Sequence, residues 1–408
     1  MPAEPAAPAR PSAGWRRPVA VVAVAQLFGT SLWFSANSAA DGLMQAWGAD
    51  AADIGILTSA VQAGFILGTL ALSLLGLADR FRASTIFVAS ALAGALFNAA
   101  FAWIAKDITS AAFFRFLVGL SLAGIYPIGM KLIVSWEPAR TGQALALLVA
   151  MLTLGTALPH FLRLSGQSLP WQWIVTGASV LAVAGAVLIH RLGTGPHLPP
   201  ARSGPGRASV LSAFAIPRFR ASALGYFGHM WELYAFWTIV PLLVTASGLA
   251  AAFPRLGVPG LSFAIIAAGA LGCLAGGALS RRLGSSAVAL GALAVSGGCA
   301  LVFAFGWQGL SSGWLLALLL VWGASVIADS PQFSALSAQA CPRDMVGGAL
   351  AIQNAAGFAI TMISISLVTA LFESMGPGAV WLLVPGPLAG LIGYRLAVRA
   401  RHDGTARP

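Results

Sequence analysis

Long apolar stretches separated by short polar segments make up this chain from residue 18 onwards. Each stretch approaches the roughly 20 residues that an α-helix needs to cross a bilayer, and none alternates apolar and polar residues as a barrel strand does. The pattern therefore predicts an all-α membrane protein with twelve transmembrane helices. We place them at 18–40, 53–77, 84–105, 111–135, 142–162, 171–190, 221–246, 260–280, 286–306, 312–335, 346–372 and 378–398.

Composition and charge support this assignment and set an orientation. Hydrophobic residues make up 58% of the chain and charged residues 9%, against roughly 25% charged in soluble proteins. With both termini in the cytoplasm, most Lys and Arg fall on the cytoplasmic side, as the positive-inside rule requires. The net charge of +11 thus reflects topology and a lipid-bilayer environment, and we expect no nucleic-acid partner. We predict a multi-pass protein of a bacterial cytoplasmic (inner) membrane.

The chain contains an internal duplication. Gly119 and Pro127 recur as Gly323 and Pro331, and the loop segment 75–82 has a counterpart in 277–284. Parallel halves of this kind are typical of secondary transporters, with the substrate site between the repeats. We expect two pseudo-symmetric six-helix bundles joined by a Pro/Gly-rich linker. The predicted parts are a disordered cytoplasmic N-terminus (1–17), an N-terminal half (18–191), a cytoplasmic linker (192–220), a C-terminal half (221–398) and a cytoplasmic tail (399–408).

The loop after the second predicted helix reads Leu77-Ala78-Asp79-Arg80. It resembles the signature Gly-x-Leu-Ala-Asp-Arg-x-Gly-Arg of the major facilitator superfamily of secondary transporters, and the resemblance extends over the whole chain. Leu75 and Arg82 stand where that family has glycine, and the second copy has Arg281 at the acidic position. The resemblance implies a conformational latch between the halves, formed by Asp79, Arg80, Arg281 and Arg282. The alternative is that these are loop charges that follow the orientation rule.

Arg115, followed by Gly119, resembles a second motif of the family. An arginine this deep in an apolar run is costly, which points to a function. In the family the equivalent arginine is associated with proton coupling or substrate contact. The alternative is that the Arg115 side chain extends to the nearby outer interface.

Two carboxylates lie well inside predicted helices, Glu232 and Asp329. A carboxylate inside a membrane disfavours its charged form, so it can take up and release protons. His229 lies one helical turn from Glu232, and histidines exchange protons near neutral pH. We therefore predict a proton-coupling site from Glu232, His229, Asp329 and Arg115. A purely structural hydrogen bond between His229 and Glu232 is the alternative.

Polar and aromatic residues form one stripe on each of helices 1, 4, 7 and 10, and in the superfamily these helices line the cavity. The predicted cavity residues are Gln26, Trp33, Asn37, Tyr126, Trp231, Tyr234, Gln332 and, from helix 11, Gln353 and Asn354. Gln62 and His160 are secondary candidates, equally suited to hydrogen bonds between helices.

These observations favour a proton-coupled transporter of a small organic solute of aromatic, vitamin-like or amphiphilic character, working by alternating access as a monomer. Drug or metabolite efflux by proton antiport is the alternative. Only the proline of the antiporter signature, Pro159, remains in helix 5, so uptake is slightly favoured. A membrane sensor or assembly factor on the same scaffold is an alternative of another class. No metal-ligand spacing, nucleophile elbow or phosphate loop is visible, so we predict no enzyme activity, no metal and no cofactor.

Overall fold

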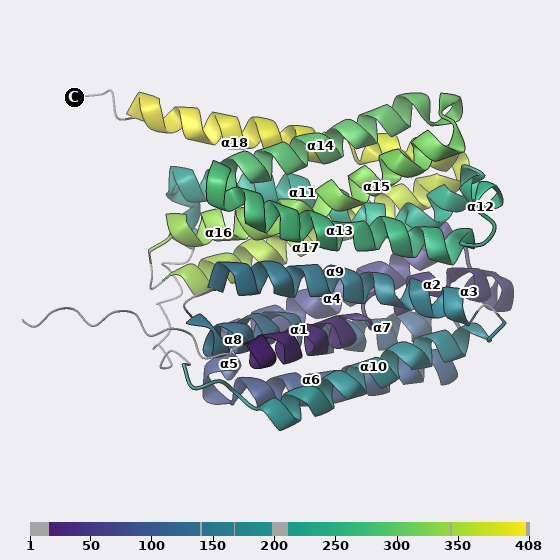
Figure 1. The fold of residues 1–408 in the computed structure, drawn as a ribbon, viewed down its shortest axis with the longest axis horizontal. Helices are drawn as coiled ribbons and strands as arrows, with labels where there is room; N and C mark the ends of the chain where they lie inside the picture. Colours follow the sequence, from purple (N-terminus) through teal and green to yellow (C-terminus); the bar gives the residue numbers. More distant parts are fainter. Residues whose placement is uncertain (1–15, 139–140, 167, 198–210, 343–344, 405–408) are drawn as a thin grey trace, which may run out of the picture.

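The computed structural model describes residues 16–138, 141–166, 168–197, 211–342 and 345–404, and helices dominate throughout (Figure 1). The first half contains α1 (Arg16–Thr30), α2 (Ser35–Ser38), α3 (Ala40–Trp47), α4 (Ala51–Leu74), α5 (Leu77–Arg80), α6 (Ala83–Trp103), α7 (Ile108–Leu122), α8 (Tyr126–Trp136), α9 (Thr141–Ser165) and α10 (Trp171–Leu192). The second contains α11 (Pro217–Ala246), α12 (Leu249–Ala252), α13 (Gly257–Leu283), α14 (Ser285–Gly306), α15 (Ser312–Ala328), α16 (Ser330–Ala340), α17 (Val346–Met375) and α18 (Pro385–Gly404).

The predicted all-α membrane fold is confirmed. No strand occurs in the part of the chain that the structure describes. Within that part, nine helical stretches are long and apolar enough to cross a membrane, and the last of them, Val346–Arg399, contains both α17 and α18. With α11 and the shorter apolar helix at Arg17–Thr30, the helix order agrees with twelve passes.

The first, fourth and tenth predicted helices are interrupted, and the twelfth, predicted from residue 378, begins as α18 only at Pro385, after a 3-10 helix over Gly376–Leu382. The fourth is divided into α7 and α8 just before Pro127, and the tenth into α15 and α16 just before Pro331. Proline lacks the N–H that would continue the helical hydrogen bonds, which explains both breaks. The first helix ends at Thr30 and resumes at Ser35 without any proline. There, side chains bind carbonyls beside the break: Ser31 Oγ donates to the Phe28 carbonyl, which also accepts from the Ser31 backbone N–H, and Arg115 donates to the Leu32 carbonyl.

The helices of each half pack mainly on one another, and Figure 1 shows the purple-to-blue half beside the green-to-yellow one. In the first half α4 packs on α7 and α6 on α10; in the second, α13 packs on α15 and α11 on α18. Two helix pairs, α4 with α17 and α9 with α13, form the main contacts between the halves. The interface between the halves is therefore lined by helices from both repeats.

The duplication seen in the sequence corresponds to equivalent helix contacts. A Cβ atom on Gly119 would lie 2.0 Å from the carbonyl oxygen of Val61, and one on Gly323 would lie 1.9 Å from that of Ile265. Only glycine permits this close backbone approach. The two pairs are separated by the same distance along the sequence. An equivalent pair of contacts joins Gly68 to Leu120 and Gly272 to Ala324.

The segment that follows α10 is tied to the ends of two helices of the first half. The backbone N–H of Ser84 donates to Thr194 Oγ1 at 3.1 Å, and that of Gly195 to Ser135 Oγ at 3.1 Å. We call this end of the bundle, with α5 and residues 193–197, the linker end. The middle of the predicted linker, residues 198–210, and the predicted disordered N-terminus up to residue 15 lie outside the described residues.

The predicted latch lies at the linker end. Arg80, Arg281 and Arg282 are exposed there, and the side chain of Asp79 lies outside the described part of the structure. Arg281 donates a hydrogen bond to the carbonyl of Gly277 on its own helix. Lys131, from α8, donates to the carbonyl of Ala78 in the signature loop. The latch between the halves stays a prediction.

Candidate functional site

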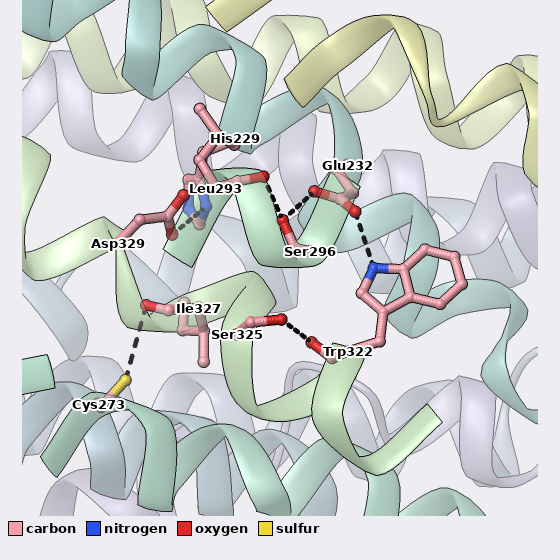
Figure 2. Close-up of polar contacts among 9 residues, drawn as sticks. All are labelled: His229, Glu232, Cys273, Leu293, Ser296, Trp322, Ser325, Ile327 and Asp329. Carbon is pink, nitrogen blue, oxygen red and sulfur yellow. Dashed lines mark hydrogen bonds and ion pairs between the residues drawn. The ribbon is translucent and has the colours of Figure 1, made fainter. Parts of the chain in front are cut away.

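His229 and Asp329 form a buried pair inside the second half. Both side chains are fully shielded from solvent, and His229 Nδ1 lies 2.8 Å from Asp329 Oδ1 (Figure 2). Asp329 lies at the break between α15 and α16, where Pro331 frees the chain to turn and the Asp329 side chain makes no helix cap. The contact has the length of an ion pair without the alignment of a hydrogen bond. His229 Nε2 and Asp329 Oδ2 have no hydrogen-bond partner among the described residues.

Glu232, also on α11, has different surroundings. Trp322 Nε1 donates to Glu232 Oε1 at 2.7 Å, and Ser296 Oγ donates to Oε2 at 2.8 Å (Figure 2). The Trp322 ring stacks on Phe236 with centroids 4.1 Å apart. Both oxygens of Glu232 are thus held between α11, α14 and α15, within the second half.

The hydrogen bond between His229 and Glu232 that the alternative interpretation required is not present. Although the two residues are three positions apart on α11, His229 pairs with Asp329, and Glu232 with Ser296 and Trp322. Sequence spacing places both on neighbouring positions of one helix. The packing of α14 and α15 against that helix then gives each a different partner.

Arg115 lies inside the first half and is completely buried, so it does not extend to the membrane surface. Its guanidinium donates to the carbonyls of Leu32 and Trp33, to Ser35 Oγ and to Asn98 Oδ1. No ion pair joins Arg115 to Glu232 or Asp329 in the described part of the structure. Arg115 is therefore separate from the other three residues of the predicted proton-coupling site in this conformation.

A cluster of aromatic rings, which we call the ring cluster, fills the interface between the halves. Trp33 stacks on Tyr234 with centroids 5.6 Å apart and on Phe358 at 5.9 Å. Phe65 lies 4.9 Å from Trp33 and 4.5 Å from Phe358. All four side chains are at most 4% exposed. The ring cluster thus combines Trp33 and Phe65 of the first half with Tyr234 and Phe358 of the second.

Three buried amides lack hydrogen-bond partners among the described residues. The side-chain oxygen and nitrogen of Gln26, Gln62 and Gln353 have no hydrogen-bond partner among the described residues, and all three side chains are 0% exposed. Gln62 lies one helical turn before Phe65 on α4. Buried amides are nearly always hydrogen-bonded to protein or to water, so the hydrogen-bonding groups of these three side chains are open to a partner outside the chain.

The remaining predicted cavity residues occupy several environments. Asn37 Nδ2 donates to Thr58 Oγ1 at 2.9 Å, while its Oδ1 has no partner within the described chain. The ring of Tyr126 lies 6.4 Å from that of Phe65, at the edge of the ring cluster. Trp231 points elsewhere: its Nε1 donates to the carbonyl of Leu382, before α18. Gln332 is buried in α16 and Asn354 is half-buried in α17.

Several residues of the site were not predicted from the sequence. Phe65 and Phe358 are ordinary apolar residues in apolar helices, so no sequence signal separates them from lipid-facing phenylalanines. Asn98 and Ser296 are polar residues in apolar stretches, and that contrast could have marked them. Among the described residues, no group of three or more His, Cys, Asp or Glu is placed to hold a metal ion.

Known proteins resemble this chain in sequence and in fold. The chain is 29% identical over 383 residues to the 3-(3-hydroxy-phenyl)propionate transporter of Escherichia coli, covering 90% of each chain. It is 34% identical over 129 residues to the niacin transporter NiaP of Acinetobacter baylyi, covering 29% of each. The solved structure of a mutant of the nucleoside transporter NupG superposes with a TM-score of 0.70 at 12% identity, covering 93% of this chain and 99% of that one.

The sequence profile of one transporter family matches residues 22–398, nearly the whole chain. That match agrees with the helical membrane fold and with the relatives, which are transporters and not enzymes. This protein belongs to the Major Facilitator Superfamily and is a multi-pass membrane transporter of small solutes.

Proposed function

We propose that the protein is a proton-coupled transporter that takes up small aromatic solutes carrying polar substituents. The observation that carries this proposal is the ring cluster between the halves, accompanied by buried amides that lack partners among the described residues. The ring cluster joins side chains of both halves, and in alternating access a solute between the halves is exposed first to one side of the membrane and then to the other.

The ring cluster suits a flat solute. Trp33 stacks on Tyr234 and Phe358 with interplanar angles of 28° and 21°, and stacked rings attract by about 0.5–1.5 kcal/mol beyond their burial. When the halves separate on one side, Trp33 moves away from Tyr234 and Phe358, and the faces of these rings are uncovered. An aromatic solute can replace the lost contacts, which an aliphatic solute of equal size cannot.

The amides supply the polar half of recognition. A buried donor or acceptor without a partner costs about 1–3 kcal/mol, and Gln26, Gln62 and Gln353 each present both kinds of atom. A hydroxyl, a carboxylate or a ring nitrogen on the solute would satisfy them. The named substrates of the two relatives, hydroxyphenylpropionate and niacin, each combine an aromatic ring with such groups. This chemistry fits the proposed site.

The His229–Asp329 pair supplies a place for the coupled proton. With one proton between them, the pair carries no net charge, either as two neutral groups or as an ion pair. Removing that proton leaves a single negative charge in the apolar bundle, which is costly. Release of the proton is therefore favoured only when the pair is open to water. That condition couples the proton to the rocking of the halves.

Flux measurements in proteoliposomes test the proposal. Purified protein is reconstituted, and uptake of radiolabelled 3-(3-hydroxyphenyl)propionate and nicotinate is followed with the outside acidic, against a protonophore control. The ring-free hexanoate serves as the matched solute. Because weak acids cross lipid bilayers unaided in their protonated form, uptake is counted only above that of protein-free liposomes under the same gradient. We expect such an excess for an aromatic acid, abolished by the protonophore, and none for hexanoate. Accumulation only with the gradient reversed indicates antiport, while the absence of flux for any aromatic probe contradicts the proposal.

A further inference from the structure

The interruption of the first transmembrane helix is bound by one arginine. Between α1 and α2 the carbonyls of Leu32 and Trp33 point to Arg115, which donates to the Leu32 oxygen at 3.0 Å and also to the Trp33 oxygen. The same guanidinium donates to Ser35 Oγ at 3.0 Å, at the first residue of α2. Arg115 thus binds the break itself and the first residue after it.

Asn98 holds that arginine in place. Its Oδ1 accepts from Arg115 at 2.9 Å and from Ser35 at 2.7 Å. Its Nδ2 donates to the carbonyl of Val175 at 2.9 Å and to Ser179 Oγ at 3.0 Å. Because every donor and two acceptor positions of the amide are used, its orientation is fixed. We call Arg115, Asn98 and Ser35 the junction. Through these contacts it joins α6, α7 and α10 to the break in helix 1.

The electrostatics explain why a cation can remain buried there. Burying a guanidinium costs several kcal/mol, and the described structure pairs Arg115 with no carboxylate. The negative end of α1 and the carbonyls released by the break supply the compensating partial charges. Four neutral acceptors of the first half thus bind the two terminal nitrogens of Arg115, while its Nε has no partner among the described residues.

The second half provides an internal comparison. Gly185 of α10 packs on the carbonyl of Ala25, and in the same way Gly390 of α18 packs on that of Gly225. This correspondence aligns α1 with α11. The position equivalent to Arg115 is occupied by Leu319, and α11 runs unbroken from Pro217 to Ala246. The break and the arginine thus occur together in one half and are both missing from the described residues of the other.

We propose that Arg115 and Asn98 are positioning residues that hold the break in helix 1 so that Trp33 and Phe34 enter the interface between the halves. Trp33 joins the ring cluster, and the Phe34 ring lies 6.0 Å from that of Trp237 in an edge-on contact. Arg115 thus acts on the solute through the ring of Trp33, not by contact with the solute or the proton. The link to the solute rests on the proposed function, whereas the link to the helix break does not.

Cysteine accessibility tests the helix break without any substrate. An Ala36→Cys reporter, at a position buried in α2 and outside the junction, is introduced into a protein whose three native cysteines are replaced by Ser. Reaction with N-ethylmaleimide is then compared with and without Arg115→Gln. We expect the arginine substitution to raise the labelling rate about fivefold or more, since a charged hydrogen-bond network is lost. An Ala182→Cys reporter on α10, also buried, should stay protected.

An unchanged labelling rate of the Ala36→Cys reporter, or an equal rise at both reporters, overturns the positioning role. If Arg115→Gln is not recovered in the membrane, Ser35→Ala removes one acceptor of Arg115 and tests the same contact, with a smaller rise expected at the Ala36→Cys reporter alone. Unchanged labelling of that variant also overturns the proposal.

A double-mutant cycle tests the link to the solute. In proteoliposomes, Arg115→Gln and Trp33→Ala should each raise the half-saturating concentration of 3-(3-hydroxyphenyl)propionate, and the double variant should be no worse than Trp33→Ala alone. Multiplicative effects would show that Arg115 does not act through Trp33. If the wild-type protein moves no aromatic probe, the proposed function fails, while the labelling result still decides the positioning role.

Discussion

His229 Nδ1 and Asp329 Oδ1 lie 2.8 Å apart and join α11 to the break between α15 and α16. This is the single contact between a basic and an acidic side chain among the described ion pairs, and both groups are fully buried. A contact that can gain or lose one proton at a proline-induced break connects protonation to the shape of the tenth transmembrane helix.

Asp329→Asn removes the acidic group while keeping its size. We expect the variant to lose accumulation driven by a pH gradient, since the amide cannot carry the proton, while exchange of labelled for unlabelled solute continues. Its exchange rate should also no longer vary with pH. The measurement is accumulation under an acid-outside gradient beside counterflow exchange at equal pH, in the same proteoliposome preparation.

His229→Gln is the companion variant, because it retains a hydrogen-bonding group next to Asp329 without the imidazole ring. Gradient-driven accumulation should fall in this variant as well. Full accumulation by Asp329→Asn would show that the proton is carried elsewhere, and Glu232 would then become the leading candidate.

Glu232→Gln should leave transport and its pH dependence close to those of the wild type. The glutamine oxygen can accept from Trp322 Nε1, and its amide can donate to Ser296 Oγ, so the contacts between α11, α14 and α15 remain. Glu232→Ala instead leaves the buried Trp322 donor without a partner, at a cost of about 1–3 kcal/mol. Thermal unfolding in detergent should show the loss for Ala and not for Gln. Loss of pH-driven accumulation in Glu232→Gln would contradict this assignment.

The helical fold could be predicted from the sequence because apolar stretches of bilayer length admit few other structures. The breaks within the helices were harder to predict. Pro127 and Pro331 mark two of them, yet proline is tolerated inside membrane helices, and Pro159 and Pro241 stay within α9 and α11. The break after Thr30 depends on hydroxyl-to-carbonyl bonds and on Arg115, which is distant in sequence. No local pattern contains that information.

The polar residues of the site were also visible in the sequence, but their partners were not. His229 and Glu232 stand out in an apolar helix, and so does Asp329. Which of them meet depends on how α11 is rotated against α14 and α15, and that rotation is set by many apolar contacts of similar strength. The ring cluster has the same origin, since Phe358 becomes part of it only through the packing of α17 on α4.

Asp107, which lies outside the apolar helices at the start of α7, should give a charge-dependent contribution to stability. Its carboxylate accepts from the backbone N–H of Ser110 at 2.7 Å and from the Ser110 hydroxyl at 2.8 Å. The backbone bond, and after it the hydroxyl bond, lower the pKa of Asp107 below its ordinary value of 3.8. A lowered pKa means that the stabilisation is complete above the unfolded-state pKa and is lost as the pH falls through the folded-state pKa.

The matched variant is Asp107→Asn, which keeps the helix cap and removes the charge. Wild type should be the more stable of the two near neutral pH, and their difference in melting temperature should disappear in acid, below the ordinary range of an aspartate. A difference that persists there would mean that the cap, and not its charge, accounts for the effect.

Alanine at Gly119 or Gly323 should destabilise the corresponding half, and to a similar extent in both. The added methyl carbon would lie 2.0 Å from the Val61 oxygen in one case and 1.9 Å from the Ile265 oxygen in the other. Backbone atoms cannot move aside cheaply, so the paired helices must separate, at a cost of about 1–3 kcal/mol. The measurement is thermal unfolding of each purified variant in detergent.

Gly291→Ala is the control for these variants. Gly291 lies inside α14, and a Cβ there would meet nothing within 4 Å. Because alanine favours the helix over glycine by about 1 kcal/mol, this variant should be as stable as the wild type or slightly more so. The Gly119 and Gly323 sites lie in separate halves and share no partner, so their effects should add in the double variant. If Gly119→Ala were as stable as Gly291→Ala, the close approach of α7 to α4 would not limit the packing of the first half. The geometric equivalence of the Gly119 and Gly323 contacts would then not extend to their contributions to stability.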